Sequence, residues 1–218
     1  ENFDILIIHP DFNYKKTITV CTTNNVLERT RQLLLQLDER PVFFFVNSTD
    51  IILAMMEQLG LRDQSAVFCS ADSVDKLKSQ KFSNAHENWE KKYMAKYNWM
   101  TSRFYNAMDI ELNENPNVVM ITDCYIADYT MIDPYMDAVQ IIGRFRNGTS
   151  NIYHISNFDE RIPVRDKRDI ITWYQCNKEI YKQIETLKNI QTDPNCRAAY
   201  NDTMGVLLYN RFLDDYGK

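Results

Sequence analysis

The chain has 218 residues, of which 44% are hydrophobic, and a formal net charge of −5. A chain of this size and apolar content can bury a core, and its acidic balance excludes a histone-like protein that binds nucleic acid through bulk positive charge. The five cysteines are scattered without a Cys-x-x-Cys pair, which excludes a disulfide framework and a structural zinc site. The scattered cysteines fit a reducing cytoplasm, and no apolar run reaches the length of a membrane span, so we expect a cytoplasmic protein without a membrane partner.

The first third of the chain alternates between strand and helix patterns. Apolar runs at 4–8 and 17–21 flank a turn and predict two strands, and residues 24–37 repeat apolar side chains at helical spacing. Five consecutive apolar residues at 42–46 predict a central strand that is buried on both faces. A helix pattern at 50–60 ends at a glycine. Since the first strand pattern begins almost at Glu1, we expect a piece of a longer polypeptide.

The alternation continues to residue 157. Short apolar strands are predicted at 65–69, 117–123 and 150–157, and the polar, lysine-rich stretch at 75–97 predicts one or two surface helices. Strands that alternate with helices indicate an α/β fold, with a parallel sheet between helices on both faces. In such sheets ligands bind at the carboxyl ends of the strands.

The character of the sequence changes after Pro163. Two long amphipathic helix patterns follow, divided near Asp193-Pro194. We therefore expect an α/β domain at 1–160 and a helical extension at 161–218.

The stretch QIIGRFRNG, residues 140–148, places Arg144 and Arg146 close together in a chain with only five glycines. A guanidinium group pairs bidentately with phosphate oxygens, so two arginines at this spacing suit a triphosphate. We expect them near the carboxyl edge of the sheet. The alternative is a pair of surface arginines in weak ion pairs.

Three segments in this order, MTSRFYNAMDI (100–110), NVVMITD (117–123) and QIIGRFRNG, resemble motifs V to VI of superfamily 2 helicases and translocases of the DEAD/DEAH type. VFFFVNS (42–48) is similar to motif IV, and VFCS (67–70) is similar to the strand of the next motif, so the likeness covers about residues 40 to 157. These motifs belong to the second, C-terminal RecA-like domain of such proteins.

Two positions depart from the family pattern. Ala107 stands where motif V has a glycine, and a side chain at that position tolerates positive φ poorly. The second arginine, Arg146, lies two positions after Arg144, whereas the motif VI pattern of the family places it three positions after the first.

The resemblance implies a three-layer RecA-like fold, of the kind found in P-loop NTPases, and a set of functional residues. Arg144 and Arg146 would be arginine fingers directed at ATP and Mg²⁺, and Gln140, Gly143 and Asp109 would lie close to the nucleotide. The residues implied in contacts with a nucleic-acid backbone, DNA in our expectation, are Thr101, Ser102, Asn47, Ser48 and Ser70. Each residue also has an ordinary structural alternative, such as a helix cap or a strand end.

The chain lacks half of a helicase ATPase site. It contains no G-x-x-x-x-G-K-[ST] phosphate loop and no Asp-Glu box, so it should not hydrolyse ATP alone. A first RecA-like domain would come from an earlier part of the polypeptide or from a partner chain. We expect no metal site, because His86-Glu87-Asn88-Trp89-Glu90 ends in Glu where a zinc protease motif requires His. The competing hypothesis is a non-catalytic α/β scaffold or nucleic-acid-binding module, favoured by Ala107 and by the altered arginine spacing.

Overall fold

The computed structural model describes residues 15–106, 108–161 and 165–213. The strand predicted at 4–8 and the departure at Ala107 lie outside these residues. The chain divides into two compact units, Glu1–Phe158 and Asp159–Lys218, which we describe separately.

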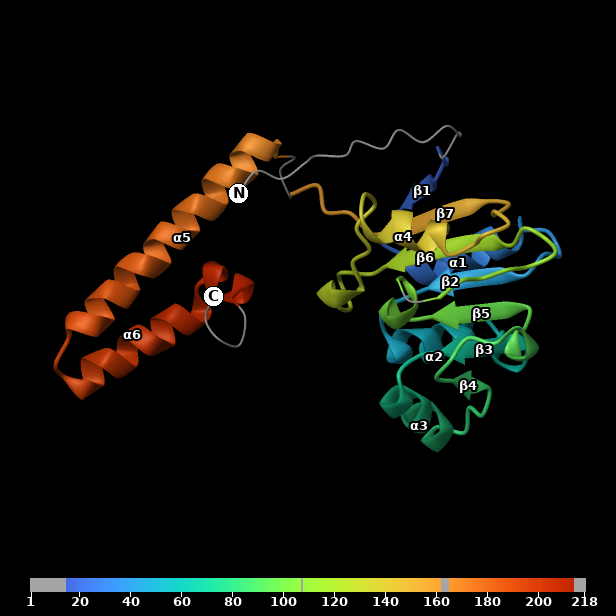
Figure 1. Cartoon of the computed structure of the whole chain (residues 1–218), viewed down its shortest axis with the longest axis horizontal. Coiled ribbons are helices and arrows are strands. Elements are labelled where there is room, and N and C mark those ends of the chain that lie inside the picture. Colours follow the sequence, from blue (N-terminus) through green and yellow to red (C-terminus); the bar gives the residue numbers. More distant parts are fainter. Residues whose placement is uncertain (1–14, 107, 162–164, 214–218) are drawn as a thin grey trace, which may run out of the picture. The chain divides into compact units, whose positions relative to one another are not determined.

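The first unit is built on one seven-stranded sheet. Its strands are β1 (Thr19–Thr22), β2 (Val42–Phe45), β3 (Ser65–Phe68), β4 (Ala85–His86), β5 (Tyr97–Met100), β6 (Asn117–Thr122) and β7 (Ile152–Ser156). Their order across the sheet is β1-β7-β6-β2-β5-β3-β4 (Figure 1), and each neighbouring pair is parallel. The predicted α/β fold with a parallel sheet is confirmed.

Helices and a long loop cover the two faces of this sheet. The helices are α1 (Val26–Leu34), α2 (Thr49–Gln58), α3 (Ala71–Ser79) and α4 (Asp137–Gly143). Alternate residues of β2 point to opposite faces: Phe44 packs with apolar residues of α1, α2 and α3, whereas Phe43 and Phe45 pack with α4 and with residues 104–112. The continuous apolar run in β2 therefore reflects burial on both faces, as the sequence predicts.

Polar side chains fix the starts of the first two helices. Asn25 accepts a hydrogen bond from the amide of Glu28 at 3.1 Å, and Ser48 accepts one from the amide of Ile51 at 3.4 Å. These N-caps satisfy amide groups that have no partner within the helix. Gly60, with a φ of 68°, follows the end of α2 in a backbone conformation that favours glycine.

The region at 75–97 differs from the prediction. Only its first part is helical, in α3, and the rest contains the two-residue edge strand β4 and a 3₁₀ turn at Lys91–Tyr93. The lysine-rich composition obscured the strand, because the only buried residue in β4 is Ala85. Pairing with β3, and not local periodicity, determines this strand.

The second unit contains the two predicted helices, α5 (Lys167–Ile190) and α6 (Pro194–Val206). Asp166 and Asp193 cap them, and Pro194 occupies the first position of α6, which suits a residue without an amide proton. No residue of α5 is buried within the described structure. Across the described residues, no helix combines the length and apolar character that a membrane span needs.

The core contains one aromatic stack that depends on a hydroxyl group. The rings of Phe44 and Trp99 stack with their centroids 4.0 Å apart, and the indole Nε1 of Trp99 donates a hydrogen bond to Ser65 Oγ at 3.1 Å. Ser65, itself buried, donates to the carbonyl oxygen of Leu61 at 2.9 Å. Ser65 thus satisfies the one polar atom of a fully buried tryptophan.

Replacing Ser65 with alanine should lower the free energy of unfolding by about 1–3 kcal/mol, because the Trp99 indole would keep its burial and lose its acceptor. Urea denaturation followed by circular dichroism measures this change. Ser79→Ala removes an exposed hydroxyl at the end of α3 and serves as the matched control, with an expected change within about 0.5 kcal/mol. Equal effects of the two substitutions would contradict the role given to Ser65.

Candidate functional site

A pocket of about 310 Å³ opens where β2, β3 and β5 end, and we call it the strand-end pocket. The five residues predicted to contact a nucleic-acid backbone all line it: Asn47, Ser48, Ser70, Thr101 and Ser102. They come together because the carboxyl ends of parallel strands meet at the same edge of a sheet. The sequence places them in three separate segments, and the parallel register of the strands brings these segments to one place.

The side chain of Asn47 ties two walls of this pocket together. Its Oδ1 accepts a hydrogen bond from the amide of Ser102 at 3.4 Å, and its Nδ2 donates to the carbonyl oxygen of Tyr129 at 2.9 Å. Ser48 and Thr101 are largely buried, and the Ser48 hydroxyl serves as the cap of α2. Ser70 and Ser102 are exposed, so their polar groups are the ones that an incoming ligand can reach.

Two helices begin at this pocket. Ser48 precedes α2 and Ser70 precedes α3, and the Ser70 side chain makes no capping hydrogen bond to its helix. The amide groups in the first turn of a helix, together with the helix dipole, favour a bound anion. The strand-end pocket therefore combines hydroxyl, amide and helix N-terminal groups, all of which suit phosphate oxygens.

Two charged side chains line the pocket, and each is paired. Arg103 contacts Glu87, with 3.1 Å between Nη2 and Oε1, and Asp50 contacts Lys76 of α3, with 2.6 Å between Oδ1 and Nζ. Neither Arg103 nor Tyr129 is among the predicted site residues. The only sequence signal for Arg103 is its position directly after Thr101 and Ser102, in the segment that resembles motif V.

A second group forms where the segments at 100–110 and 140–148 meet. Ile110 and Phe145 form an isolated parallel bridge, in which the amide of Ile110 donates to the carbonyl oxygen of Arg144 at 2.8 Å. The amide of Arg146 in turn donates to the carbonyl oxygen of Ile110 at 3.1 Å. Both bridging residues are buried, and the Phe145 ring packs edge-on against Phe43 of β2, with 5.2 Å between centroids.

The two arginines make different contacts within this group. The Arg144 guanidinium donates to the carbonyl oxygens of Asn106 at 3.0 Å, Met108 at 3.4 Å and Gln140 at 3.1 Å. Arg146 instead forms an ion pair with Asp109, with 2.6 Å between Nη2 and Oδ1, and both side chains are about half exposed. Arg144 thus fastens the backbone of a loop, whereas Arg146 stands in an open ion pair.

Gln140 and Gly143 complete this group. Gln140 Oε1 accepts from Arg144 Nη2 at 3.4 Å, and Gly143, the last residue of α4, accepts through its carbonyl oxygen from Arg146 Nη1 at 3.2 Å. A Cβ atom added to Gly143 would meet no described atom within 4 Å. Packing inside the described chain therefore does not require glycine at this position.

The prediction that the arginines lie near the carboxyl edge of the sheet stays a prediction, and the structure places them outside the lining of the strand-end pocket. Arg144, Arg146, Asp109, Gln140 and Gly143 are brought together, but none of them lines the strand-end pocket among the residues that the structure describes. The group lies over the sheet face that carries Phe43 and Phe45, because Ile110 and Phe145 anchor it in that part of the core.

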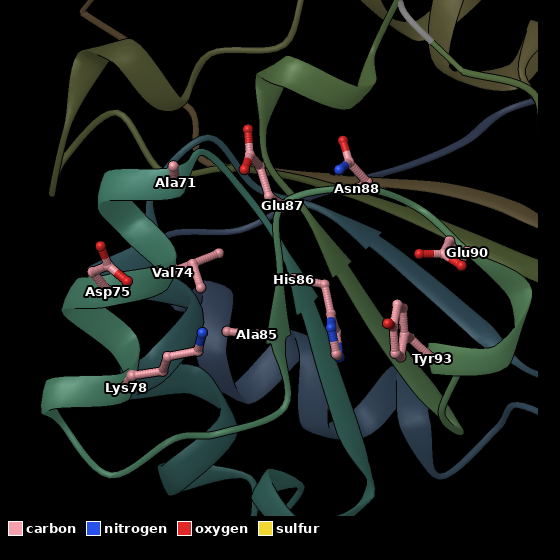
Figure 2. A pocket seen from close by; sticks show the side chains of 10 residues that line it. All are labelled: Ala71, Val74, Asp75, Lys78, Ala85, His86, Glu87, Asn88, Glu90 and Tyr93. Carbon is pink, nitrogen blue, oxygen red and sulfur yellow. The ribbon is translucent and has the colours of Figure 1, made fainter.

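A further pocket of about 320 Å³ lies between α3 and the segment that follows β4 (Figure 2). It is predominantly acidic, and the carboxylates of Asp75, Glu87 and Glu90 outnumber the single lysine, Lys78. The ring of His86 stacks on Tyr93 with 3.9 Å between centroids, and burial lowers the pKa of His86. In the described part of the chain, no group of three or more His, Cys, Asp or Glu side chains is placed to hold a metal ion.

Comparison of the sequence with known protein families and with curated proteins finds no match. Among solved structures, the chain is similar to the C-terminal domain of the DEAD-box protein Dbp5. The two are 14% identical, the similarity covers 76% of this chain and 84% of that chain, and the TM-score is 0.40. This is a likeness of fold alone.

The different contacts of the two arginines predict different effects on stability. Arg144→Ala should lower the free energy of unfolding by about 1–3 kcal/mol, because several backbone carbonyl groups lose a charged donor. Arg146→Ala breaks a half-exposed ion pair and should cost no more than about 1 kcal/mol. Urea denaturation of the two variants side by side measures the difference, and a larger loss for Arg146→Ala would contradict this assignment.

Proposed function

We propose that this chain is the second RecA-like domain of an ATP-dependent helicase or translocase that moves on nucleic acid, with DNA as the expected substrate. The observation that carries the proposal is the strand-end pocket. Five residues chosen for their similarity to the nucleic-acid-binding motifs of one family line a single pocket at the edge of the sheet where α/β proteins bind ligands.

The chemistry of the strand-end pocket suits a sugar-phosphate backbone. Ser70, Ser102 and Asn47 offer hydroxyl and amide groups, and two helix N-termini favour anionic oxygens. Contacts of this kind hold the backbone of a strand without reading its sequence. A protein that moves along nucleic acid requires binding of this type, because it must accept every sequence that it meets.

The arginine group supports the nucleotide part of the proposal. Arg146 has an exposed guanidinium whose ion pair with Asp109 is open to solvent, and the bare Cα of Gly143 leaves space beside it. Gly143 is the last residue of α4, and packing inside the described chain does not require glycine there, so space remains beside Arg146 for a ligand or a facing domain.

Within this group the residues have separable tasks. Arg146 would face the phosphates of ATP, and Asp109, released from Arg146, would be available to the nucleotide. Arg144 would act as a positioning residue, because its guanidinium donates both to the carbonyl oxygens of Asn106 and Met108 and to that of Gln140 in α4. Bound ATP with Mg²⁺ would supply the phosphoryl group to be cleaved, and the magnesium ligands would come from a first RecA-like domain, since the described residues hold no suitable acidic cluster.

The alternative function is a non-catalytic α/β scaffold or nucleic-acid-binding module of a larger assembly. One observation favours it: Arg144, at the position of the first motif VI arginine, directs its guanidinium at carbonyl oxygens of its own domain. In this alternative, the arginine group has only a structural task. The two functions differ in whether Arg146 affects turnover.

The test uses the parent protein together with its first RecA-like domain, whether that domain is in the same polypeptide or on a partner chain. Arg146→Ala should reduce nucleic-acid-stimulated ATP hydrolysis by about 10³-fold or more, the effect of losing an arginine that stabilises the transferring phosphoryl group. Arg146→Lys should fail to restore activity, because an ammonium group cannot make the bidentate contact.

Arg31→Ala is the matched control. Arg31 also stands in a half-exposed ion pair, with Glu28 on α1, and its loss should leave ATP hydrolysis unchanged. Near-normal turnover of Arg146→Ala, or a parent assembly without any phosphate loop, would contradict the catalytic proposal and favour the scaffold.

A further inference from the structure

Arg103 is the only cationic side chain among the described residues that line the strand-end pocket. It lies in the 3₁₀ turn Ser102–Phe104, three residues after the end of β5 and next in the chain to Thr101 and Ser102. Its contact with Glu87 joins one nitrogen to one oxygen at 3.1 Å, and the side chains are 44% and 48% exposed. Single-contact ion pairs at this exposure contribute little to stability and are screened by salt, so this pair opens readily.

Among the charged residues of the pocket lining, Arg103 is the one that can bind an anion. Asp50 is the only acidic residue among the described residues of the pocket lining, and Lys76 neutralises it at 2.6 Å. Glu87 therefore determines whether Arg103 is available. A phosphate group offers two oxygens to a guanidinium and makes a stronger, bidentate contact than the present one.

Glu87 contacts Arg103 from the edge of the neighbouring acidic pocket. Figure 2 shows its carboxylate directed away from the stacked rings of His86 and Tyr93, which lie on the other side of the strand segment. Glu87 also borders the acidic pocket, with Asp75 and Glu90 beyond it. Since that pocket repels phosphate, Arg103 marks the end of the surface that suits a nucleic-acid backbone.

Tyr129 gives the strand-end pocket an exposed aromatic ring. The residue is 61% exposed and lines the pocket, and its carbonyl oxygen accepts from Asn47 Nδ2 at 2.9 Å. The next residue, Thr130, is fully buried and accepts through Oγ1 from the amide of Asp123 at 2.9 Å. Ile132 is also buried. On the other side of Tyr129, Ala127 packs partly buried against the core, and its carbonyl oxygen accepts from the amide of Thr130 at 3.1 Å. The chain is thus anchored before and after a ring that it leaves in contact with solvent.

We propose that the strand-end pocket binds one nucleotide of a single strand, whose phosphate replaces Glu87 on Arg103 and whose base stacks on Tyr129. The inference rests on the proposed function and defines its substrate more narrowly. An aromatic ring stacks with an unpaired base of any sequence, whereas the bases of a duplex are already stacked on each other. The combination of Arg103 and Tyr129 in one pocket therefore selects a single strand.

The base contact is tested with the full 218-residue chain by fluorescence anisotropy. The probes are a fluorescein-labelled strand of about 12 thymidine nucleotides, within the range that one binding site of this kind covers, and the same strand annealed to its complement. The unmodified chain should prefer the single strand, and Tyr129→Ala should weaken single-strand binding about tenfold while leaving duplex binding unchanged, since one stacked base is lost. Tyr129→Phe keeps the ring and should bind as the unmodified chain does.

Tyr135→Ala is the matched control for the base contact. Tyr135 is 87% exposed in the same connection between β6 and α4, and it does not line the strand-end pocket. Its loss should leave binding of both probes unchanged. Equal effects of Tyr129→Ala and Tyr135→Ala would show that any exposed apolar ring in this connection contributes, which would overturn the assignment to the pocket.

The phosphate contact is tested by salt titration of single-strand binding. Arg103→Gln should weaken binding and reduce the slope of log K against log salt concentration by about 0.7, the loss of one phosphate contact on a single strand. Glu87→Gln should strengthen binding several-fold, because it removes the competitor of the phosphate. In the Arg103→Gln background, Glu87→Gln should have no effect, since residues that act through one contact are not additive.

Glu90→Gln makes the same change of charge in the acidic pocket, away from Arg103, and should leave binding unchanged. An equal gain from Glu90→Gln and Glu87→Gln would indicate general repulsion and would overturn the exchange at Arg103.

The outcomes separate this inference from the proposed function. Failure of the unmodified chain to bind either probe would count against the proposed function itself. Binding of strand and duplex with equal affinity, or insensitivity to Tyr129→Ala, would overturn only the inference. Loss of association with a first RecA-like domain in Tyr129→Ala, with nucleic-acid binding intact, would assign the ring to a protein interface and would also overturn it.

Discussion

The parallel register of β2 with β5, and of β5 with β3, is the constraint on which the candidate site depends. Phe45 of β2 lies opposite Met100 of β5, and Met100 lies opposite Phe68 of β3, so the three strands end at the same level. The polar residues that follow each strand are therefore neighbours, although up to 55 residues of chain separate them, as between Asn47 and Ser102. A single antiparallel strand at this place would carry its polar end to the opposite edge. A parallel sheet of this kind must be covered on both faces. Phe43 and Phe44 show this, because they point to opposite faces and both are buried.

Coverage of one face also creates the arginine group. Phe104, Tyr105, Ile110 and Leu112 pack on the face that carries Phe43, and the bridge between Ile110 and Phe145 ties them to the segment after α4. The hydrogen bonds of Arg144 secure the same junction from outside. The contacts that bury Phe145 therefore also position the guanidinium group of Arg146, the next residue in the chain. This coupling explains why one arginine of the pair is internally engaged while the other remains open.

The sequence predicts the parts of the fold whose burial is uniform along a segment. The runs at 42–46 and 118–121 are apolar throughout because β2 and β6 are interior strands, and short apolar runs between turn signals are typical of strands buried on both faces. The edge strand β4 escaped prediction because two residues carry no periodicity and only β3 defines it. The interior strand β5 escaped prediction because Tyr97 and the buried Asn98 interrupt any apolar run there. The strand-end residues were predicted through the resemblance to motifs IV and V, and Asn47, Ser48 and Ser70 also follow predicted strands. The roles considered for Arg103 and Tyr129 depend on Glu87 and Asn47, which lie far away in the sequence, so no local pattern contains them.

Charge pairing within the strand-end pocket bears on how an acidic chain can act on nucleic acid. The net charge of −5 gives no general attraction for a polyanion, and both charged residues of the pocket lining are already paired. Affinity must then come from local exchange, in which a phosphate group replaces a carboxylate, and from neutral donors such as amides and hydroxyl groups. A phosphate group that must replace a carboxylate binds more weakly than one that binds an unpaired cation, because the ion pair with the carboxylate is lost. On the proposed function this weakness is useful, since a domain that moves along a strand has to release it in every cycle. A chain that bound through unpaired surplus charge would hold the strand more tightly and would leave it more slowly.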